Sequence, residues 1–332
     1  MNTFRQYVFL KTYFTFLILS SVISSCEKTP EDLKDPAETD KWSLYNTSTG
    51  LPGNQVRGTF CDSRDDIWFA VSSNGAAKYS NGTWTYYNTS NSDILSNGIT
   101  CIEEDNYGNI LFGTTNGISI LSSTNTWSYY RETSVILSIT CIKTDSQGNL
   151  WIGTTNQGFL IFDGVEIAQI YYEIFKTIND IEEDSRGNIW IGTDNGLLKW
   201  DGNSFTLISV GDGLPDDIVT ALFSDSKNRL WVGTYYGETV SWIDSQGIHQ
   251  KSLLNGDMPV EINDICEDAA GNIWFSTYDS GLIKYDQVVP YAYKKYNGLP
   301  ENDIIASARD NDGNVWFGLY SKGLLKYSLP ID

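Results

Sequence analysis

The sequence predicts an all-β fold, a seven-bladed β-propeller whose N-terminal strand closes the last blade. Three observations predict it. A repeat of about forty residues occurs seven times, and each copy has room for four short strands. The last copy stops after its third strand, and a strand-like segment precedes the first copy. The 332 residues include 11 Trp, 20 Tyr and 29 Gly, and aromatic residues suit pleated strands whereas glycine suits tight turns.

Three landmarks with constant spacing define the repeat. An aspartate stands six positions before a tryptophan in six copies, and before Leu111 in the other. A β-branched apolar residue precedes each aspartate by six positions, and a glycine follows each tryptophan, or Leu111, by six or seven. The aspartates are Asp62, Asp105, Asp145, Asp184, Asp225, Asp268 and Asp310. We expect each aspartate to accept backbone N–H groups within the turn between the first two strands.

The fourth copy shows how one repeat divides into strands. We expect strands a to d at residues 178–183, 189–193, 197–200 and 204–209, with turns rich in Gly and Asn between them. Such a small twisted sheet buries both faces only against neighbouring sheets, which is typical of a propeller. An open solenoid would need polar caps at its two ends, and the sequence has none.

The two ends of the repeat array complement each other. The seventh copy stops after its third strand, Leu324–Tyr327, and the orphan segment Trp42–Tyr45 resembles the fourth strand of other copies. Pairing of these two strands would complete the last blade and remove two exposed sheet edges. We therefore expect residues 41–332 to form one closed ring.

Residues 1–25 have the order of a signal peptide. Arg5 and Lys11 precede an apolar run that is too short to span a bilayer. The following Ile23-Ser24-Ser25-Cys26 resembles the bacterial lipobox, in which the cysteine is lipidated and becomes the new N-terminus. An ordinary signal peptide with a chance cysteine is the alternative.

Residues 26–40 predict a flexible acidic tether, because they are polar, rich in acids and contain two prolines. We therefore expect an outer-membrane lipoprotein that touches the membrane by its lipid anchor only. The acids after Cys26 resemble the signal that sends some lipoproteins to the cell surface. Both a surface-exposed and a periplasm-facing position stay open.

The net charge of −20 argues against nucleic acid as a partner, since phosphate binding requires clustered Lys and Arg. The cysteines Cys61, Cys101, Cys141 and Cys266 lie in apolar strand contexts, where we expect small buried hydrophobes. His249 is the only histidine, so no Cys/His metal spacing exists. We predict neither a metal nor a cofactor.

The phrase D-x-x-G-N-[IL]-W-[IF]-G-T…G-[LI]-x-K-[YW] resembles the two-component regulator propeller repeat. Asp184–Trp200 and Asp310–Tyr327 carry it most fully, and the likeness covers residues 42–328. The first, fifth and sixth copies depart from the pattern at single turn or strand positions. In that family such propellers form periplasmic sensor parts of hybrid histidine kinases and are linked to glycan recognition. The sequence shows no kinase or DNA-binding segment, so the resemblance implies ligand recognition rather than phosphotransfer.

The residues offer little for catalysis. A Ser-His-Asp triad could use only His249, which we expect at the c–d connection of the fifth copy, away from the ligand entrance. Asp310–Asn314 partly resembles a calcium loop but lacks its spacing and bidentate Glu. No catalytic residue is predicted, and a lyase or hydrolase acting on a sugar or anionic substrate is the alternative.

The b–c loop tips vary while their flanks recur, so we predict the ligand site there. Tyrosines of neighbouring tips flanked by polar groups suit the apolar faces and hydroxyls of sugar rings, and a protein partner is the second option. The predicted binding residues are Tyr235, Tyr236, Tyr278, Asp279, Tyr320, Lys322, Asn156, Gln157, Asp194 and Asn195. The chain is thus predicted to be a non-catalytic recognition or scaffold propeller of the cell envelope.

Overall fold

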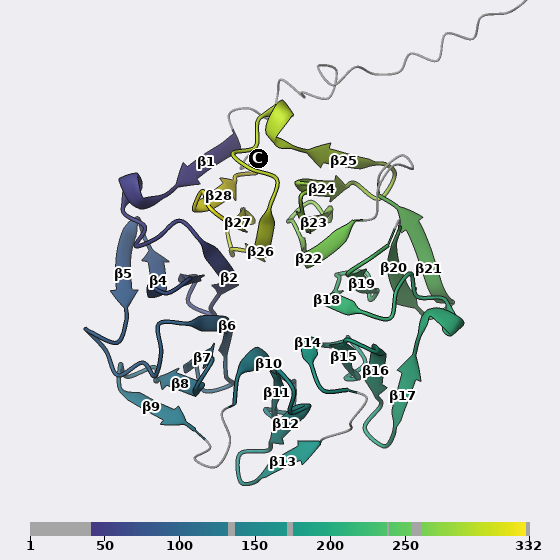
Figure 1. Cartoon of the computed structure of the whole chain (residues 1–332), viewed down its shortest axis with the longest axis horizontal. Helices are drawn as coiled ribbons and strands as arrows, with labels where there is room; N and C mark the ends of the chain where they lie inside the picture. The colour runs from purple at the N-terminus through teal and green to yellow at the C-terminus, as the bar shows by residue number, and fades with distance from the viewer. Residues whose placement is uncertain (1–40, 132–136, 171–174, 238, 254–259, 330–332) are drawn as a thin grey trace, which may run out of the picture.

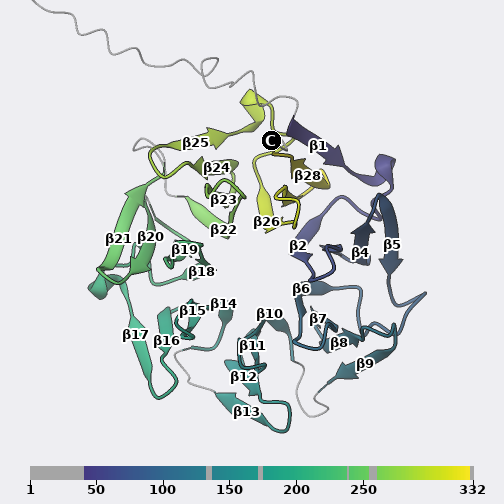
Figure 2. The same cartoon turned by 180° about the vertical axis from the view of Figure 1, so that it is seen from behind.

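A computed structural model describes residues 41–131, 137–170, 175–237, 239–253 and 260–329. The predicted signal peptide (1–25), the tether (26–40) and Cys26 lie outside these residues. Seven four-stranded antiparallel sheets surround a central axis like the blades of a propeller (Figures 1 and 2). The predicted fold class is confirmed. Within the described ranges, no helix has the length and apolar character needed to cross a membrane.

Strand a of each blade lines the ring axis (Figure 1). In blades 1 to 7 it is β2 (Val56–Cys61), β6 (Ile99–Glu104), β10 (Ile139–Thr144), β14 (Ile178–Glu183), β18 (Val219–Ser224), β22 (Glu261–Glu267) and β26 (Ile304–Arg309). Strand b follows as β3 (Ile67–Val71), β7 (Ile110–Thr114), β11 (Leu150–Thr154), β15 (Ile189–Thr193), β19 (Leu230–Thr234), β23 (Ile273–Tyr278) and β27 (Val315–Leu319).

Strands c and d form the outer half of each blade. Strand c is β4 (Gly75–Ser80), β8 (Gly117–Leu121), β12 (Phe159–Phe162), β16 (Gly196–Trp200), β20 (Thr239–Asp244), β24 (Leu282–Tyr285) and β28 (Leu324–Tyr327). Strand d is β5 (Thr83–Tyr87), β9 (Trp127–Tyr130), β13 (Ile167–Ile170), β17 (Phe205–Ile208), β21 (Gly247–Ser252), β25 (Pro290–Tyr293) and, in blade 7, β1 (Trp42–Tyr45). Three short 3₁₀ turns follow strand d: η3 (Thr47–Thr49), η4 (Val210–Asp212) and η5 (Lys295–Asn297). In the fourth repeat, strands a and b match their predicted bounds, whereas c begins one residue earlier and d is shorter by one residue at each end.

The N-terminal strand closes the ring as predicted. β1 pairs antiparallel with β28, with Trp42 opposite Tyr327 and Tyr45 opposite Leu324. The Trp42 ring lies 4.8 Å from the Tyr327 ring and meets Trp274 of blade 6 edge-on at 6.0 Å, both measured between ring centroids. The closing strand therefore adds both backbone pairing and aromatic contacts.

The constant step from aspartate to tryptophan has a direct cause. In blade 4, Oδ1 of the buried Asp184 accepts the backbone N–H groups of Arg186 and Asn188, which fixes the a–b turn. Its Oδ2 accepts the indole N–H of Trp190 at 2.9 Å. The same aspartate–indole bond occurs in all six blades that carry the tryptophan. The predicted turn role is confirmed, and the indole bond was not predicted.

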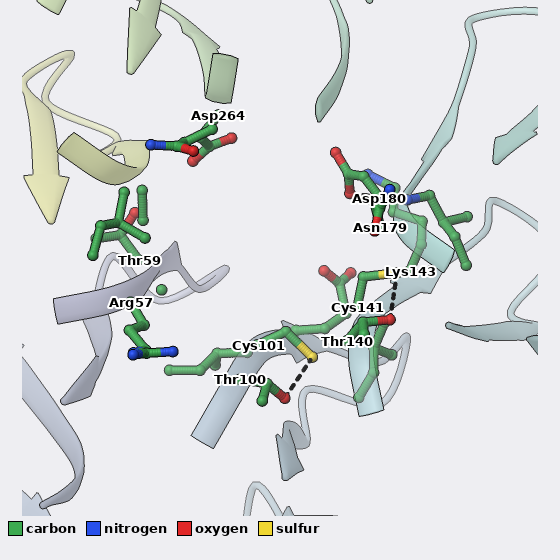
Figure 3. A pocket seen from close by; sticks show the side chains of 18 of the residues that line it. Arg57, Thr59, Thr100, Cys101, Thr140, Cys141, Lys143, Asn179, Asp180 and Asp264 are labelled. Atoms are coloured by element: carbon green, nitrogen blue, oxygen red, sulfur yellow. Dashed lines mark hydrogen bonds between the residues drawn. The ribbon is translucent and has the colours of Figure 1, made fainter. Parts of the chain in front are cut away.

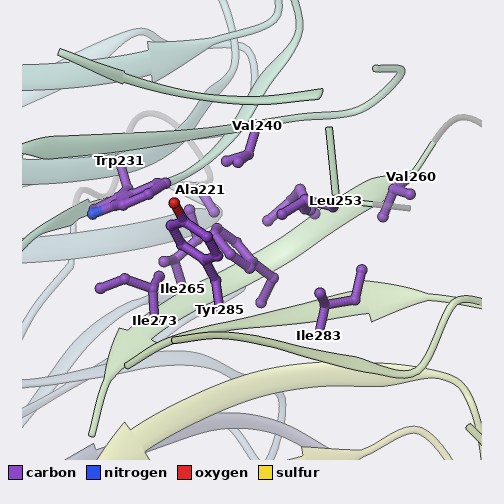
Figure 4. Packing of buried hydrophobic residues seen from close by; sticks show 11 residues of the cluster. Ala221, Trp231, Val240, Leu253, Val260, Ile265, Ile273, Ile283 and Tyr285 are labelled. Atoms are coloured by element: carbon purple, nitrogen blue, oxygen red, sulfur yellow. The ribbon is translucent and has the colours of Figure 1, made fainter. Parts of the chain in front are cut away.

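Apolar clusters fill the spaces between neighbouring blades. The cluster between blades 5 and 6 joins Trp231 of β19 to Ile265, Ile273 and Tyr285 of blade 6 (Figure 4). The close approach of blades also explains the glycine of strand b, since a Cβ on Gly153 would lie 2.8 Å from Cγ2 of Ile178 in the next blade. That glycine and the β-branched landmark are thus one packing unit.

Candidate ligand-binding funnel

Strand a carries a β-bulge at the same position in every blade. In blade 4, Ile178 pairs with Thr193 and Asp180 pairs with Gly192, which leaves Asn179 without a ladder partner. Bulges re-aim side chains, and here the bulged residues line the central channel. We call these seven residues the neck ring: Arg57, Thr100, Thr140, Asn179, Thr220, Asn263 and Ile305.

Two cavities meet at the neck ring. The outer cavity, the mouth, has a volume of about 500 Å³ and is lined also by Thr155, Tyr278 and Tyr320 of the b–c tips. The inner cavity, the chamber, has a volume of about 260 Å³ and lies against the deeper residues of strand a (Figure 3). Mouth, neck ring and chamber together form a funnel on the ring axis.

Hydrogen bonds across blades hold three members of the neck ring. Asn179 donates to the carbonyl of Val219 at 2.8 Å, and Asn263 donates to the carbonyl of Ile304 at 2.7 Å. Thr220 makes the corresponding bond from blade 5 to blade 6. Three successive blade contacts are therefore tied at the neck, which keeps this part of the funnel preorganised.

The chamber is lined with ionisable side chains. Nζ of Lys143 in blade 3 lies 2.7 Å from Oε2 of Glu182 in blade 4. Glu103 lines the chamber from blade 2. Asp180 and Asp264 point into the same space from blades 4 and 6 (Figure 3). Each of these two carboxylates accepts a backbone N–H from the next blade, from Leu222 and Ser307 respectively.

Burial shifts the protonation of these acids. It raises the pKa of Asp180 to about 8, despite the hydrogen bond from Leu222, which acts in the opposite direction. Burial also raises the pKa of Glu103 to about 7 and that of Asp264 to about 6. The chamber therefore holds carboxyl groups that exchange protons near neutral pH.

Cys101 and Cys141 also line the chamber. Cys141 and Cys266 are buried as predicted, but Cys61 and Cys101 are only half-buried. The prediction was wrong for these two, and for Cys101 the reason is that its apolar sequence context does not reveal that strand a borders a channel. Burial still raises the pKa of the Cys101 thiol to about 12, which keeps it protonated.

The structure places two of the ten predicted ligand residues at the mouth, Tyr278 and Tyr320 on neighbouring blades. Asp194 lies one contact away, because its carboxylate accepts a hydrogen bond from Asn179 at 3.0 Å. Tyr235 and Tyr236 are exposed on the adjacent tip of blade 5. The others lie on b–c tips without lining either cavity: Asn156, Gln157, Asn195, Asp279 and Lys322.

His249 lies far out on the blade. It belongs to strand β21 rather than to the c–d connection, which corrects the prediction by a few residues. Its ring stacks on Trp242 with centroids 5.1 Å apart, and Nε2 lies 3.0 Å from Oδ1 of Asp244. The histidine therefore packs on the outer edge of blade 5, away from the funnel.

The neck ring and the chamber acids were not predicted from the sequence. A bulge leaves no composition signal of its own, so the position after each β-branched landmark looked like an ordinary strand residue. A usable signal existed, because that position is polar in six of seven repeats although both neighbouring positions are mostly apolar or small.

The family comparison agrees with the repeat. A model described as "Two component regulator propeller" matches residues 93–116, 136–156, 173–195, 213–236, 257–279 and 298–321, one stretch in each of blades 2 to 7. Each stretch contains strands a and b of its blade and ends at the b–c tip. The chain belongs to the two component regulator propeller family. Blade 1 is outside the match, in keeping with its departures from the pattern. No curated protein matches this two component regulator propeller by sequence.

Solved structures share its fold. It is similar to the extracellular domain of a protein from B. thetaiotaomicron assigned to the hybrid two component systems, with a TM-score of 0.73 and 21% identity over 87% of this chain and 41% of that one. A second such domain, assigned to a one component system of the same organism, gives a TM-score of 0.72 and 20% identity. That match covers 88% of this chain and 40% of the other. This propeller thus spans about two fifths of those chains.

A lyase has the same ring. An inactive variant of virginiamycin B lyase from Staphylococcus aureus, solved with quinupristin, gives a TM-score of 0.73 and 14% identity. The match covers 87% of this chain and 99% of the lyase. At these identities the likenesses establish the shared fold alone.

Proposed function

We propose that this two component regulator propeller is a non-catalytic recognition protein of the bacterial cell envelope whose ligand binds in the funnel. The observation that carries the proposal is the neck ring, seven bulged side chains directed to one axis beneath a mouth of about 500 Å³. Ligand sites are typically preformed concave cavities with a few convergent polar groups. The likeness to extracellular domains assigned to a hybrid two component system and to a one component system supports a sensor-type role.

The lining of the mouth favours a glycan. Tyr278 and Tyr320 are about half exposed, at 56% and 49%, so their rings are free to stack on the apolar face of a sugar. Below them, Thr140, Thr220 and Asn263 offer hydroxyl and amide groups for sugar hydroxyls. A protein partner stays the alternative, because the tyrosines of blade 5 widen the exposed aromatic surface.

A glycan library screened against the purified chain tests this proposal. Binding should be lost in a Tyr278→Ala, Tyr320→Ala double variant and retained in Tyr107→Ala, which removes a tyrosine that is 83% exposed on an a–b turn, at the opposite end of the blade. Binding that survives the double variant would place the ligand elsewhere. A pull-down of an envelope protein that depends on Tyr235 and Tyr236 instead would favour the protein partner.

We also propose that Cys26 is lipidated and tethers the propeller to the outer membrane. The lipobox-like residues 23–26 and the acidic stretch 27–40 support this. The chain should fractionate with membranes and move to the soluble fraction on Cys26→Ala substitution. Protease treatment of intact cells would separate a surface-exposed from a periplasm-facing protein.

A lyase or hydrolase is the second candidate function. The chamber supports it, since Glu103 and Asp180 have pKa values near neutral, as general acids and bases require. The ring is also shared with virginiamycin B lyase. Turnover of a bound glycan that stops on Asp180→Asn substitution, with binding intact, would favour this candidate over pure recognition.

A further inference from the structure

Arg57 differs from the other members of the neck ring. Thr100, Asn179, Thr220 and Asn263 all donate hydrogen bonds to the channel wall. The guanidinium of Arg57 has no hydrogen-bond or salt-bridge partner among the described residues, and the side chain is exposed to the funnel. It is also the only charged side chain of the ring.

An unpaired guanidinium in a funnel is suited to an oxyanion. Arginine carries five N–H donors in a planar fork and cannot lose its charge. Carboxylate and sulfate groups match this fork with two parallel hydrogen bonds, which are stronger than neutral ones. Three other arginines are already paired, since Arg64, Arg186 and Arg229 each form a salt bridge with the aspartate of their own a–b turn.

The charges around Arg57 do not prevent anion binding. Its neck neighbours are neutral, and the charged groups that line the chamber are Glu103, Lys143, Asp180, Glu182 and Asp264. The positive charge of Lys143 offsets the negative charge of Glu182, whose Oε2 lies 2.7 Å from Nζ of the lysine. Burial raises the pKa of the three remaining acids, so near neutral pH the chamber carries less negative charge than the count of carboxyl groups suggests.

We infer that the ligand bears an oxyanion, a carboxylate or sulfate on a sugar ring, and that Arg57 binds it at the neck. This inference rests on the proposed glycan-binding function and makes it more specific. The tyrosines of the mouth would stack on the sugar ring, while Arg57 selects acidic over neutral sugars. Arg57 is therefore assigned as the specificity residue of the funnel.

Matched pairs of probes test the inference by calorimetry with the purified full chain. The pairs are oligogalacturonide against its methyl ester, and sulfated against unsulfated dextran oligosaccharide. We expect the acidic member of one pair to bind about tenfold or more tightly than its neutral partner, the effect of one charge-assisted hydrogen bond. Arg57→Gln should abolish that preference, and Arg57→Lys should retain part of it.

The control is Arg186→Gln, which removes an arginine from an a–b turn on the other side of the ring and should leave the preference intact. Equal melting temperatures of wild type and Arg57→Gln would exclude a folding effect, since Arg57 holds no wall contact. Binding of neutral members only, or an acidic preference that survives Arg57→Gln, overturns the inference while the proposed function stands. If neither member of either pair binds, the inference is overturned as well. The Tyr278→Ala, Tyr320→Ala double variant then cannot be tested with these sugars.

Discussion

The indole N–H of Trp190 donates a 2.9 Å hydrogen bond to Oδ2 of Asp184 inside blade 4. The same carboxylate also holds the a–b turn, so one buried aspartate joins turn and core. We expect Asp184→Ala to lower the free energy of unfolding by about 3 kcal/mol. The substitution leaves the Trp190 indole N–H and two turn N–H groups without an acceptor, and each unsatisfied buried donor costs about 1–3 kcal/mol. Urea unfolding measures the loss.

Blade 2 provides the control. Leu111 replaces the tryptophan there, and Asp105 bonds only to its turn and to Asn109. Asp105→Ala should therefore be less destabilising than Asp184→Ala. Equal losses would show that the indole bond adds nothing to the turn.

The contribution of the closing strand β1 to stability can be tested with a second pair of variants. Trp42 is half-buried against rings of blades 6 and 7, so Trp42→Ala should cost about 3 kcal/mol, the low end for removing a buried tryptophan. Leu44 lies in the same strand but is 40% exposed, and Leu44→Ala should cost under about 0.5 kcal/mol. Thermal unfolding monitored by tryptophan fluorescence would detect the difference. Similar melting temperatures for the two variants would contradict an anchoring role of Trp42.

The chamber acids predict a pH dependence of stability. Their pKa values are raised in the folded state, to about 8 for Asp180 and about 7 for Glu103, so the folded chain binds more protons than the unfolded chain between pH 4 and 8. The free energy of unfolding should therefore fall as pH rises through this range. Asp180→Asn keeps a neutral side chain and a hydrogen-bond acceptor for Leu222, and should flatten the decline.

Asp279→Asn is the matched control for this experiment, since Asp279 is exposed on a b–c tip. Its decline with pH should equal that of the wild type. Denaturant titrations at pH 5, 6, 7 and 8 provide the comparison, and a wild-type slope in Asp180→Asn would refute the role of this group.

Filling the neck should close the funnel. Ile305 is the one apolar member of the neck ring, so Ile305→Trp adds volume without removing a hydrogen bond. We expect binding of any funnel ligand to fall at least about tenfold with little loss of stability. Calorimetry with the sugar identified by library screening measures this. Unchanged affinity would place the ligand outside the neck.

The fold could be predicted closely because the residues that define a blade recur at fixed spacing, and each has a physical cause. Each repeat aspartate accepts backbone N–H groups of its own a–b turn, and the strand-b glycine of five blades makes room for the β-branched residue of the next blade. Trp42 does not recur, but its segment resembles the fourth strand of other copies, and its ring packs against Trp274.

The funnel could be predicted only in part. Tyr278 and Tyr320 were recognisable as variable tips on neighbouring blades. Arg57 and Asp180 were not, because their direction depends on a bulge, which is a property of strand register and not of residue type. Register is decided by pairing across the blade, and a single strand sequence does not record it.

The pairing of β1 with β28 has a consequence for how the molecule is made. Trp42 and its partner Tyr327 lie 285 positions apart in the chain. The first strand to leave the ribosome or a secretion channel must wait for nearly all the others before it finds its place. Contacts of such sequence separation are slow to form. Until then, blade 7 presents an open edge, so the ring cannot close before nearly the whole chain has been made.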